Sequence, residues 1–233
     1  MPTVYLKLSH TNINLVERKR TAAVLAAELN QPDLPKLIEH FLYDQLYAET
    51  GSVASNGHQP LPQFHGKISV YMSAISTFCA PSDLSGISGM WHECVQATLS
   101  WNRGPSQHDC VFVNVDPNTE GFLGLDVARI HLFFSIDYQG ITYPCALIRW
   151  MSCLGDKPDE DTGMWMVEPA SNADGTPFMS VIHLDCILRA AHLIGICGDM
   201  FLHKDLSFNQ SLDAFVAFYV NKFVDHHAFE IAY

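Results

Sequence analysis

The chain has 233 residues, of which 48% are hydrophobic and 16% are charged, a composition typical of a globular protein that excludes a largely disordered chain. The formal net charge is −12 and the 13 basic residues are scattered, so the chain lacks the clustered basic surface with which proteins hold nucleic acid by its phosphates. No apolar run approaches the ~20 residues of a membrane span, and the N-terminus lacks a signal-peptide pattern, so we expect an intracellular protein that contacts no membrane.

Residues 1–50 are predicted to be helical. Asn14 is a suitable cap for a helix that runs to about Leu29, because apolar side chains recur on one stripe between them. A Gln-Pro pair ends this helix, since proline opposes helical geometry in the residue before it. Residues 33–49 form a second predicted helix, whose apolar side chains at spacings of three and four would pack on the first helix or on a sheet.

A linker and a second domain are predicted to follow. Residues 51–66 are rich in glycine, serine and proline and show no period, which indicates a loop. Residues 67–72 alternate apolar and polar side chains as in a short strand, and the apolar run 110–115 suits a buried strand. We therefore divide the chain into a helical N-terminal segment with its linker, residues 1–65, and an α+β domain, residues 66–233.

The centre of this domain is predicted to be a pair of strands. Residues 128–136 alternate between apolar and mostly polar side chains, which is the period of a strand with one face in a core. A turn follows, in which Gly140 can take a positive φ. Residues 141–153 are apolar on both faces, as in a central strand, and Pro144 marks either a bulge or the exposed start of that strand.

The remaining elements complete an antiparallel sheet. Residues 164–169 and 178–184 read as two strands joined by a hairpin loop with an Asp-Gly turn. Four short strands at close spacing predict a small sheet that curls into a barrel. The apolar run 188–197 fits either a helix or a strand, whereas 211–223 has the capping residues and the spacing of a helix.

The sequence contains no specific signature of catalysis or metal binding. His92-Glu93 begins like the zinc motif H-E-x-x-H, but Gln96 stands where the second histidine would be. The acidic loop 156–161 lacks the register of a calcium loop. The seven cysteines form no C-x-x-C pair and are interpreted as reduced, structural thiols. We therefore expect no metal ion, no cofactor and no enzymatic activity, and place a hydrolase or metalloenzyme last among the alternatives.

Two sets of residues are candidates for binding. The aromatic side chains could line a pocket on the barrel, as in cages that bind methylated lysine, or they could form the barrel's core. The only dense basic cluster is a triplet that would lie on the solvent face of a helix. The aromatic set is Phe134, Tyr143, Trp150 and Trp165, and the basic set is Arg18, Lys19 and Arg20.

Several stretches resemble a known protein family. APSDLSGISGMWHE, DCVFVNVD, GFLGLDVARIHLFFSI, YPCALIRWM, GDKPDEDTGMWMVEP, VIHLDCILRAAHLI and SLDAFVAFYVNKFVDHHAFEIA occur here in this order. From about residue 82 to residue 233 the chain resembles the C-terminal region of the Plavaka-type transposases of mushroom-forming fungi. The resemblance implies a DNA-handling, nuclear setting. It also implies that the recombinase chemistry belongs to an RNase-H-like core upstream, and no catalytic carboxylate of that core can be carried over to this chain.

The pattern and the resemblance together predict a transposase-derived, non-catalytic accessory domain. Its fold is expected to be α+β, with N-terminal helices packed beside a curled antiparallel sheet or a small SH3-like barrel, and with a C-terminal helix. It would bind a protein partner or chromatin through the barrel face and the acidic loop. The alternative is a nucleic-acid-contacting module of a transposition complex that uses the basic triplet. The residues assigned to partner binding are Phe134, Tyr143, Trp150, Trp165, Asp159 and Asp161.

Overall fold

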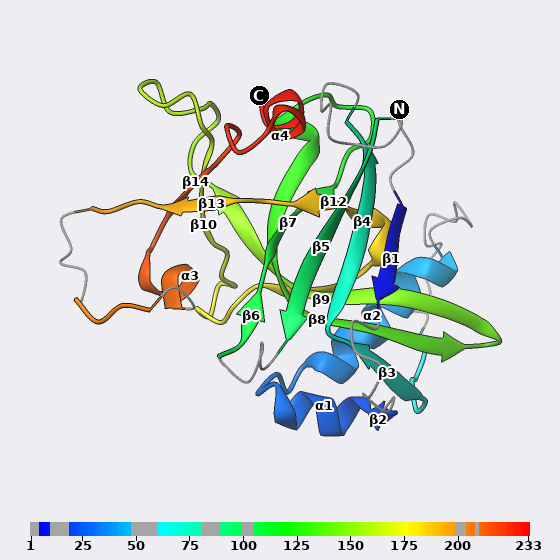
Figure 1. The fold of residues 1–233 in the computed structure, drawn as a ribbon. Helices are drawn as coiled ribbons and strands as arrows, with labels where there is room; N and C mark the ends of the chain where they lie inside the picture. The colour runs from blue at the N-terminus through cyan, green and yellow to red at the C-terminus, as the bar shows by residue number, and fades with distance from the viewer. Residues whose placement is uncertain are drawn as a thin grey trace.

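The structure is a computed structural model that describes residues 19–47, 60–80, 89–98, 105–198, 204–207 and 210–233, together with the backbone of residues 5–9. These residues form a curled antiparallel sheet shaped as a half-barrel, with helices beside it (Figure 1). The predicted α+β class and the curled antiparallel sheet are therefore confirmed. No helix in the described part of the chain is both long and apolar enough to cross a membrane.

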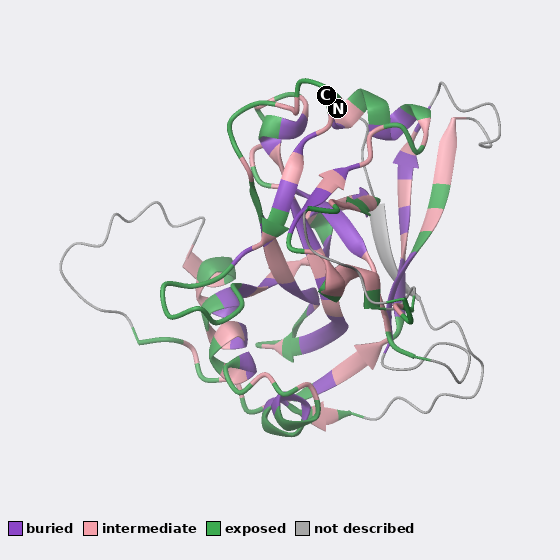
Figure 2. Ribbon diagram, turned by 90° about the vertical axis from the view of Figure 1, so that its left-hand side faces the viewer, coloured by how far each residue is buried: buried purple, intermediate pink, exposed green. Residues whose placement is uncertain are grey.

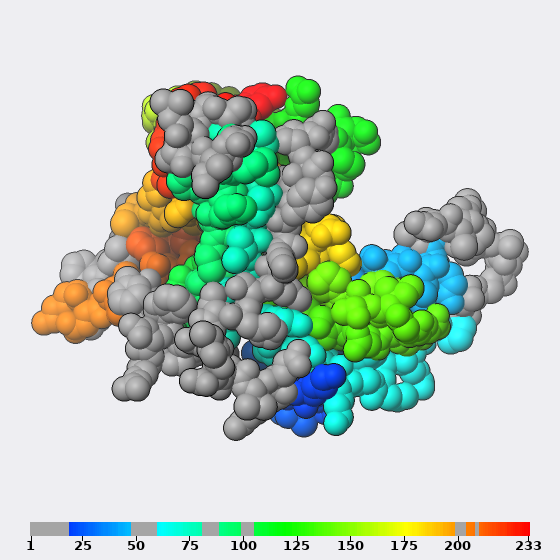
Figure 3. All heavy atoms as spheres, turned by 45° about the vertical axis from the view of Figure 1, so that its right-hand side comes forward, coloured from blue at the N-terminus to red at the C-terminus, as the bar shows by residue number. Residues whose placement is uncertain are grey.

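Two long strands, β8 (Leu125–Tyr138) and β9 (Ile141–Cys153), form the centre of the sheet. They pair antiparallel from Ala128↔Trp150 to Tyr138↔Ile141. The connecting residues Gln139 and Gly140 have φ values of 52° and 81°, the left-handed pair that a two-residue hairpin requires. The predicted strand–turn–strand unit is thus confirmed, but the expectation that β8 has only one face in a core was wrong. Ile130 and Phe133 are buried on one face and Leu132 and Phe134 on the other, because the register shift at His131 interrupts the alternation. The tip of this hairpin projects at the right of Figure 1 and lies beside α2 at the surface in Figure 3.

Each long strand has two successive partners along its outer edge. β8 pairs with β3 along residues 133–136 and with β7 along residues 125–129. β9 pairs with β11 along residues 145–149 and with β10 along residues 151–153. Both changes of partner occur at about the same level of the hairpin, because Arg129 lies opposite Arg149. The partner strands are β3 (Lys67–Tyr71), β7 (Cys110–Asn114), β10 (Met166–Pro169) and β11 (Met179–His183).

Shorter strands extend this sheet, and a second sheet packs against it. β2 continues it beyond β3, β12 beyond β7, and β14 and β13 beyond β10. The second sheet has the order β1-β4-β5-β6, with antiparallel pairing throughout. The bounds are β1 (Tyr5–Ser9), β2 (Arg20–Thr21), β4 (Ser73–Cys79), β5 (Met90–Thr98), β6 (Gln107–His108), β12 (Ile187–Ala190), β13 (Leu193–Gly195) and β14 (Phe218–Val220).

Two helices cover one end of the sheet. α1 (Ala22–Glu28) is capped by Thr21, whose side chain accepts a hydrogen bond from the backbone N–H of Val24. α2 (Leu34–Tyr47) is amphipathic and buries Leu34, Ile38, Phe41 and Leu42, as its spacing predicts. The buried side chains of α1 and α2 pack against the strand residues of β8, β9 and β11 that face them. We call this hydrophobic cluster the helix-covered cluster. Its fully buried members include Leu25, Leu34, Ile38, Leu42, Ile68, Phe134, Ile136, Cys145 and Leu147.

Two further hydrophobic clusters complete the core, and Figure 2 shows the buried stretches along the strands. On the opposite face of β8 and β9, Ile130 and Ile148 pack against Val95 of the second sheet. On the same face as the helix-covered cluster, but at the other end of the hairpin, a C-terminal cluster surrounds Phe112, Trp165 and Phe218. The short helices of this end are η2 (Phe122–Gly124), α3 (Ser211–Ala214) and α4 (His226–Ile231), whereas η3 (Leu184–Cys186) belongs to the cluster on the opposite face.

Two helical predictions were wrong. The first helix does not begin near Asn14, which lies outside the described residues: β2 directly precedes α1, and Tyr5–Ser9 form a strand on β4. The helix predicted over 211–223 ends at Ala214, because Phe218–Val220 lie between β10 and β13 and hydrogen-bond to both. Pairing with distant strands outweighs the local helical spacing in both segments. The ambiguous run 188–197 likewise contributes to two strands, β12 and β13.

The predicted hairpin between β10 and β11 needs a correction. Both strands pair with the same edge of β9 and not with each other. The loop between them is an excursion from that edge that does form a short hairpin, with an antiparallel bridge between Ser171 and Pro177. Its Asp-Gly turn does form, and Gly175 has a φ of 82°.

Pro144 is the fourth residue of β9 and is partly buried, so it does not mark the exposed start of the strand. It lies directly before Cys145, where pairing with β11 begins, so no β11 partner is opposite its missing N–H. The register shift lies elsewhere, at His131 on β8.

Candidate functional site

The four predicted aromatic residues do not converge on one pocket. Phe134 and Tyr143 are buried in the helix-covered cluster, with exposed fractions of 0% and 9%. Trp165 is 4% exposed and stacks on Phe122 in the C-terminal cluster, with ring centroids 5.0 Å apart. Trp150 packs against the cluster on the opposite face of the sheet. The rings therefore belong to three separate parts of the core, which is the alternative that the sequence left open.

The acidic loop uses its carboxylates locally. Asp159 accepts hydrogen bonds from the backbone N–H and the hydroxyl of Thr162, at 2.9 and 2.7 Å, and these bonds lower its pKa. Lys157 forms an ion pair with Glu160, while Asp161 is exposed. Within the described ranges, no three His, Cys, Asp or Glu side chains are grouped so that they could hold a metal ion. The loop residues thus form a self-contained turn.

The structure also shows where the histidine and cysteine candidates lie. His92 and Glu93 lie on β5, a strand, so the helical face that H-E-x-x-H requires does not form. All seven cysteines are free, but Cys94, Cys153 and Cys197 are exposed, so the interpretation as structural thiols does not hold for these three. Cys110 and Cys145 are buried, and burial raises the pKa of the Cys110 thiol to about 12.

The basic triplet is only partly described. Arg18 lies outside the described residues. Lys19 is exposed, and Arg20 lies on β2, where it forms an ion pair with Glu28 of α1. Both precede α1, so they do not decorate the face of a helix. The charge of Arg20 is matched within the fold.

A different basic pair stands out at the centre of the sheet. Arg129 of β8 and Arg149 of β9 are directly opposite each other in the antiparallel register. Opposite residues project from the same face with Cβ atoms about 4.5–5.5 Å apart, and like charges in this position destabilise a sheet. The structure therefore places two guanidinium groups side by side where the sheet alone gives no reason for them.

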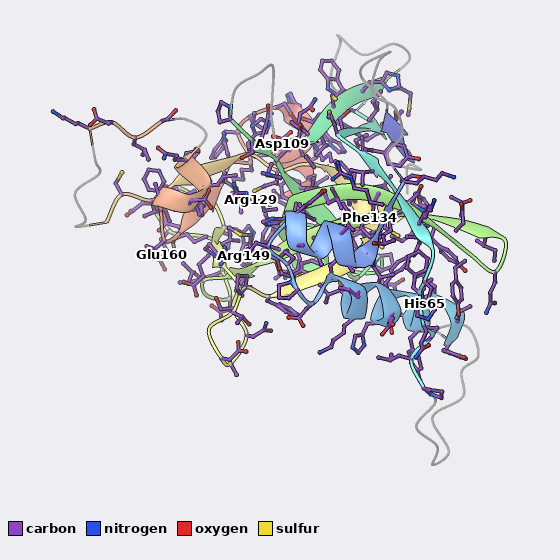
Figure 4. The ribbon with its side chains drawn as sticks, turned by 90° about the horizontal axis from the view of Figure 1, so that it is seen from below. His65, Asp109, Arg129, Phe134, Arg149 and Glu160 are labelled. Carbon is purple, nitrogen blue, oxygen red and sulfur yellow. The ribbon has the colours of Figure 1, made fainter. Side chains whose placement is uncertain are left out.

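The Arg129–Arg149 pair lies in the interval between two hydrophobic clusters. On the same face, Leu132 and Leu147 belong to the helix-covered cluster, whereas Val127 and Met151 belong to the C-terminal cluster. Figure 4 shows the two labelled arginines between α1 on one side and α3 on the other. This is also the level at which both long strands change their outer partner. The pair therefore occupies the seam between the two ends of the molecule.

Two imidazoles border the Arg129–Arg149 pair. His131, at the bulge of β8, stacks on His108 of β6 with ring centroids 5.6 Å apart and planes at 28°. Nδ1 of His108 is 3.1 Å from the carbonyl oxygen of Ile130. Burial, then the neighbouring His108 and the two arginines, lower the pKa of His131 to about 4. Burial and Arg129 also lower the pKa of His108, so both rings are neutral near pH 7.

The positive charge of the pair exceeds the negative charge that faces it. Asp213 of α3 accepts two hydrogen bonds from Arg129, at 2.6 and 3.3 Å. Arg149 has no hydrogen-bond or ion-pair partner among the described side chains, and burial lowers its pKa. Three buried nitrogen atoms there have no hydrogen-bond partner in the part of the chain that the structure describes: Nε of Arg129, Nε of Arg149 and Nε2 of His131. Two permanent positive charges and one carboxylate leave a site that can accept an anion.

A second arginine cluster provides a contrast. Arg189 of β12 is 1% exposed and forms two hydrogen bonds with Asp225, at 2.8 and 2.6 Å. It also contacts Glu93 at 3.4 Å and His227 at 3.3 Å, and its guanidinium lies 4.7 Å from the ring centre of Phe78. Its charge is more than matched, so this cluster ties strands to the C-terminal helix.

The sequence contained a signal for the Arg129–Arg149 pair that pattern reading did not use. Arg129 belongs to the polar side of its alternating strand, which is ordinarily assigned to solvent. Arg149 is the one charged residue of a strand that is otherwise apolar on both faces. A single arginine in an otherwise apolar central strand indicates that the strand is not covered by hydrophobic core at that position.

The comparisons with known proteins return no relative. No protein-family model matches the chain, and neither a curated protein nor a solved structure matches it significantly. The resemblance to the Plavaka-type transposases therefore stays a prediction.

Proposed function

We propose that the chain is a binding module that recognises an anionic group of a partner protein through Arg129 and Arg149. The observation that carries this proposal is the seam itself: two directly opposed arginines, partly buried, faced by a single carboxylate. The chemistry needed is an oxyanion, either the carboxylate of an acidic side chain or the phosphate of a phosphorylated one.

Guanidinium groups suit this role for geometric and electrostatic reasons. A planar guanidinium presents its N–H donors as a fork that matches the two oxygens of a carboxylate or phosphate. Repulsion between Arg129 and Arg149 is stronger at a partly buried position than in water, because the effective dielectric constant is lower. An anion placed between the two groups would relieve that repulsion. The repulsion thus favours the occupied state.

The charge distribution favours a protein partner over nucleic acid. The chain carries a net charge of −12, which opposes the approach of a polyanion. Proteins that hold nucleic acid need positive charge along several phosphates, whereas this positive charge is concentrated in one pair. Within the basic triplet, Arg20 is already paired with Glu28. This reading agrees with the expectation, drawn from the resemblance, of an accessory domain that binds a protein.

The test uses labelled peptides and compares two variants. A short glutamate peptide and a short phosphoserine peptide present the two oxyanions, and a glutamine peptide of equal length is the neutral control. Arg149→Gln should weaken binding of at least one acidic peptide about tenfold or more, the effect of losing a charge-assisted hydrogen bond. Lys36→Gln removes the same charge from an exposed side chain of α2, 75% exposed, and should leave binding unchanged.

A second measurement on the unmodified protein tests the proposal even if the Arg149→Gln variant does not fold. In the unmodified protein, titration with the acidic peptide should shift the Nε–H resonances of Arg129 and Arg149 in a nitrogen-15 NMR spectrum. The proposal is overturned if neither acidic peptide moves these resonances, or if binding is the same in Arg149→Gln and Lys36→Gln. Binding of a single-stranded or duplex oligonucleotide in preference to both peptides would replace it with the nucleic-acid alternative.

A further inference from the structure

We infer that Asp213 is an internal ligand of the Arg129–Arg149 pair. The carboxylate of Asp213 occupies the position on Arg129 that the anionic group of the partner takes when it binds. This inference rests on the proposed function and adds the regulation of the same site. The partner must displace a group of the chain itself before it can engage both arginines.

The contact has the geometry expected of a ligand. Both carboxylate oxygens of Asp213 accept from the two terminal nitrogens of Arg129, at 2.6 and 3.3 Å, in the fork-to-fork arrangement of arginine and carboxylate. Asp213 therefore shows, on this protein, how an oxyanion is held at the seam. Arg149, directly opposite on the neighbouring strand, stays outside this contact.

The two ends of the contact differ in burial. The side chain of Arg129 is 14% exposed, whereas that of Asp213 is 61% exposed. The guanidinium is thus fixed in the sheet, and the carboxylate reaches it from the solvent side. A group arriving from solvent meets Asp213 first and competes with it for the same N–H donors.

The element that carries Asp213 is suited to give way. α3 has four residues, none of them buried, and its N-cap residue Gln210 makes no side-chain capping bond. The partly buried side chains of Leu212 and Phe215 connect this segment with the C-terminal cluster. A helix of a single turn has little stability of its own, so the Asp213 contact can be exchanged without loss of the core.

A positioning role for Asp213 predicts the opposite effect on binding. If Asp213 only orients Arg129 for the ligand, its removal weakens binding of the acidic peptide. If Asp213 competes with the ligand, its removal strengthens binding about twofold to fivefold, which corresponds to the free energy of an exposed ion pair. The direction of the change in affinity therefore decides between the two roles.

The experiment compares Asp213→Asn with Asp33→Asn. Asp33 is 72% exposed on its side chain and lies at the start of α2, so both variants change the net charge equally. Asp213→Asn should bind the glutamate peptide about twofold to fivefold more tightly than the unmodified protein, and Asp33→Asn should bind it as the unmodified protein does. An affinity of Asp213→Asn equal to or below that of Asp33→Asn overturns the inference.

A second measurement uses the unmodified protein. Saturation with the glutamate peptide should move the carbon-13 resonance of the Asp213 carboxyl group toward the position of a free aspartate. An unchanged resonance at saturation overturns the inference, even where the variant is too unstable to titrate. Failure of the proposed function is distinguishable, because binding would then be insensitive to Arg149→Gln. Binding that depends on Arg149 with no change at Asp213 would exclude the internal ligand alone.

Discussion

Arg189 and Arg149 both lie on strands of the same sheet, but their surroundings differ in charge balance and in access. Arg189 is buried against two carboxylates, an imidazole and an aromatic ring. Arg149 lies beside a second arginine, and the carboxylate that the described residues place at that site, Asp213, binds the other guanidinium. Arg149 and Arg189 each have a buried Nε with no hydrogen-bond partner among the described residues. The charge of Arg189 is matched by carboxylates, whereas Arg149 has no carboxylate partner among the described side chains.

The difference between the two clusters separates a structural arginine from a recognition site. A buried arginine with matched charge contributes to folding because removing it leaves its partners uncompensated. An arginine with an unmatched charge contributes little to folding, since nothing in the fold depends on it. Stability measurements and binding measurements should therefore give opposite rankings for the two clusters.

The largest expected effect is on the folded state. Arg189→Ala should lower the free energy of unfolding by about 3–5 kcal/mol, because it removes a buried guanidinium and leaves the partly buried Glu93 and Asp225 without their counter-ion. Urea denaturation followed by circular dichroism measures this change. Arg149→Gln is the matched comparison and should change the free energy of unfolding by less than about 1 kcal/mol. Equal losses in both variants would remove the distinction between the clusters.

The next effect is the dependence of stability on pH. Burial and Arg189 lower the pKa of His227, so the unfolded chain binds a proton below about pH 6.5 that the folded chain does not, and stability falls as the pH is lowered. Hydrogen bonds from Arg189 and Ala228 lower the pKa of Asp225 against the opposing effect of burial, so its contribution is present above about pH 4 and is lost below it.

The histidine part of this dependence can be isolated. His227→Gln should reduce the fall in stability between about pH 7 and about pH 5 by an amount on the order of 1 kcal/mol. Urea denaturation at several pH values measures it, with the exposed His226 changed to Gln as the control. A slope that is the same in both variants would contradict the assignment of His227.

The third effect concerns binding and sharpens the role of the seam. An anion held by Arg129 and Arg149 lies close to His131 and raises its pKa from about 4, so binding should strengthen as the pH is lowered from about 7 to about 5. The expected gain for the glutamate peptide is about threefold, opposed in part by protonation of the peptide itself. His131→Gln should bind with a smaller gain, and an undiminished gain would place the titrating group elsewhere.

The smallest effect is a gain in stability. Arg149→Leu should raise the free energy of unfolding by up to about 1 kcal/mol, because it removes the repulsion from Arg129 and places an apolar side chain between Leu147 and Met151. Thermal or urea unfolding measures the change. A loss of about 2 kcal/mol or more would mean that Arg149 has a partner in the fold.

The parts of the fold that could be predicted are those whose pattern is local. The β8–β9 hairpin follows from alternation and from a two-residue turn that accepts positive φ at Gly140. α2 follows from its apolar spacing, which matches the face it buries. By contrast, the segment around Phe218 has the spacing of a helix and becomes a strand because two distant strands pair with it.

The candidate site could not be predicted for a related reason. Alternation assigns Arg129 and Phe134 to opposite faces of β8, and only the bulge at His131 brings them to the same face. Alternation also does not say what covers that face at each level. The elements that cover this face depend on where the pairing partner of β8 changes from β3 to β7 and where that of β9 changes from β11 to β10. These partner strands come from residues far apart in the sequence. The aromatic set illustrates the same limit, since Trp150 and Tyr143 lie on one strand yet belong to different clusters.

The excursion between β10 and β11 has a practical consequence for attaching probes. Its two ends are fixed at a single residue of β9, because Trp150 accepts from the N–H of Ala170 and donates to the carbonyl of Phe178. Residues added between these anchors would lengthen the loop and leave the ladder of β9 in register. The Asp174-Gly175 turn is therefore the position at which a fluorescent tag or a tether can be inserted while the rest of the molecule keeps its shape.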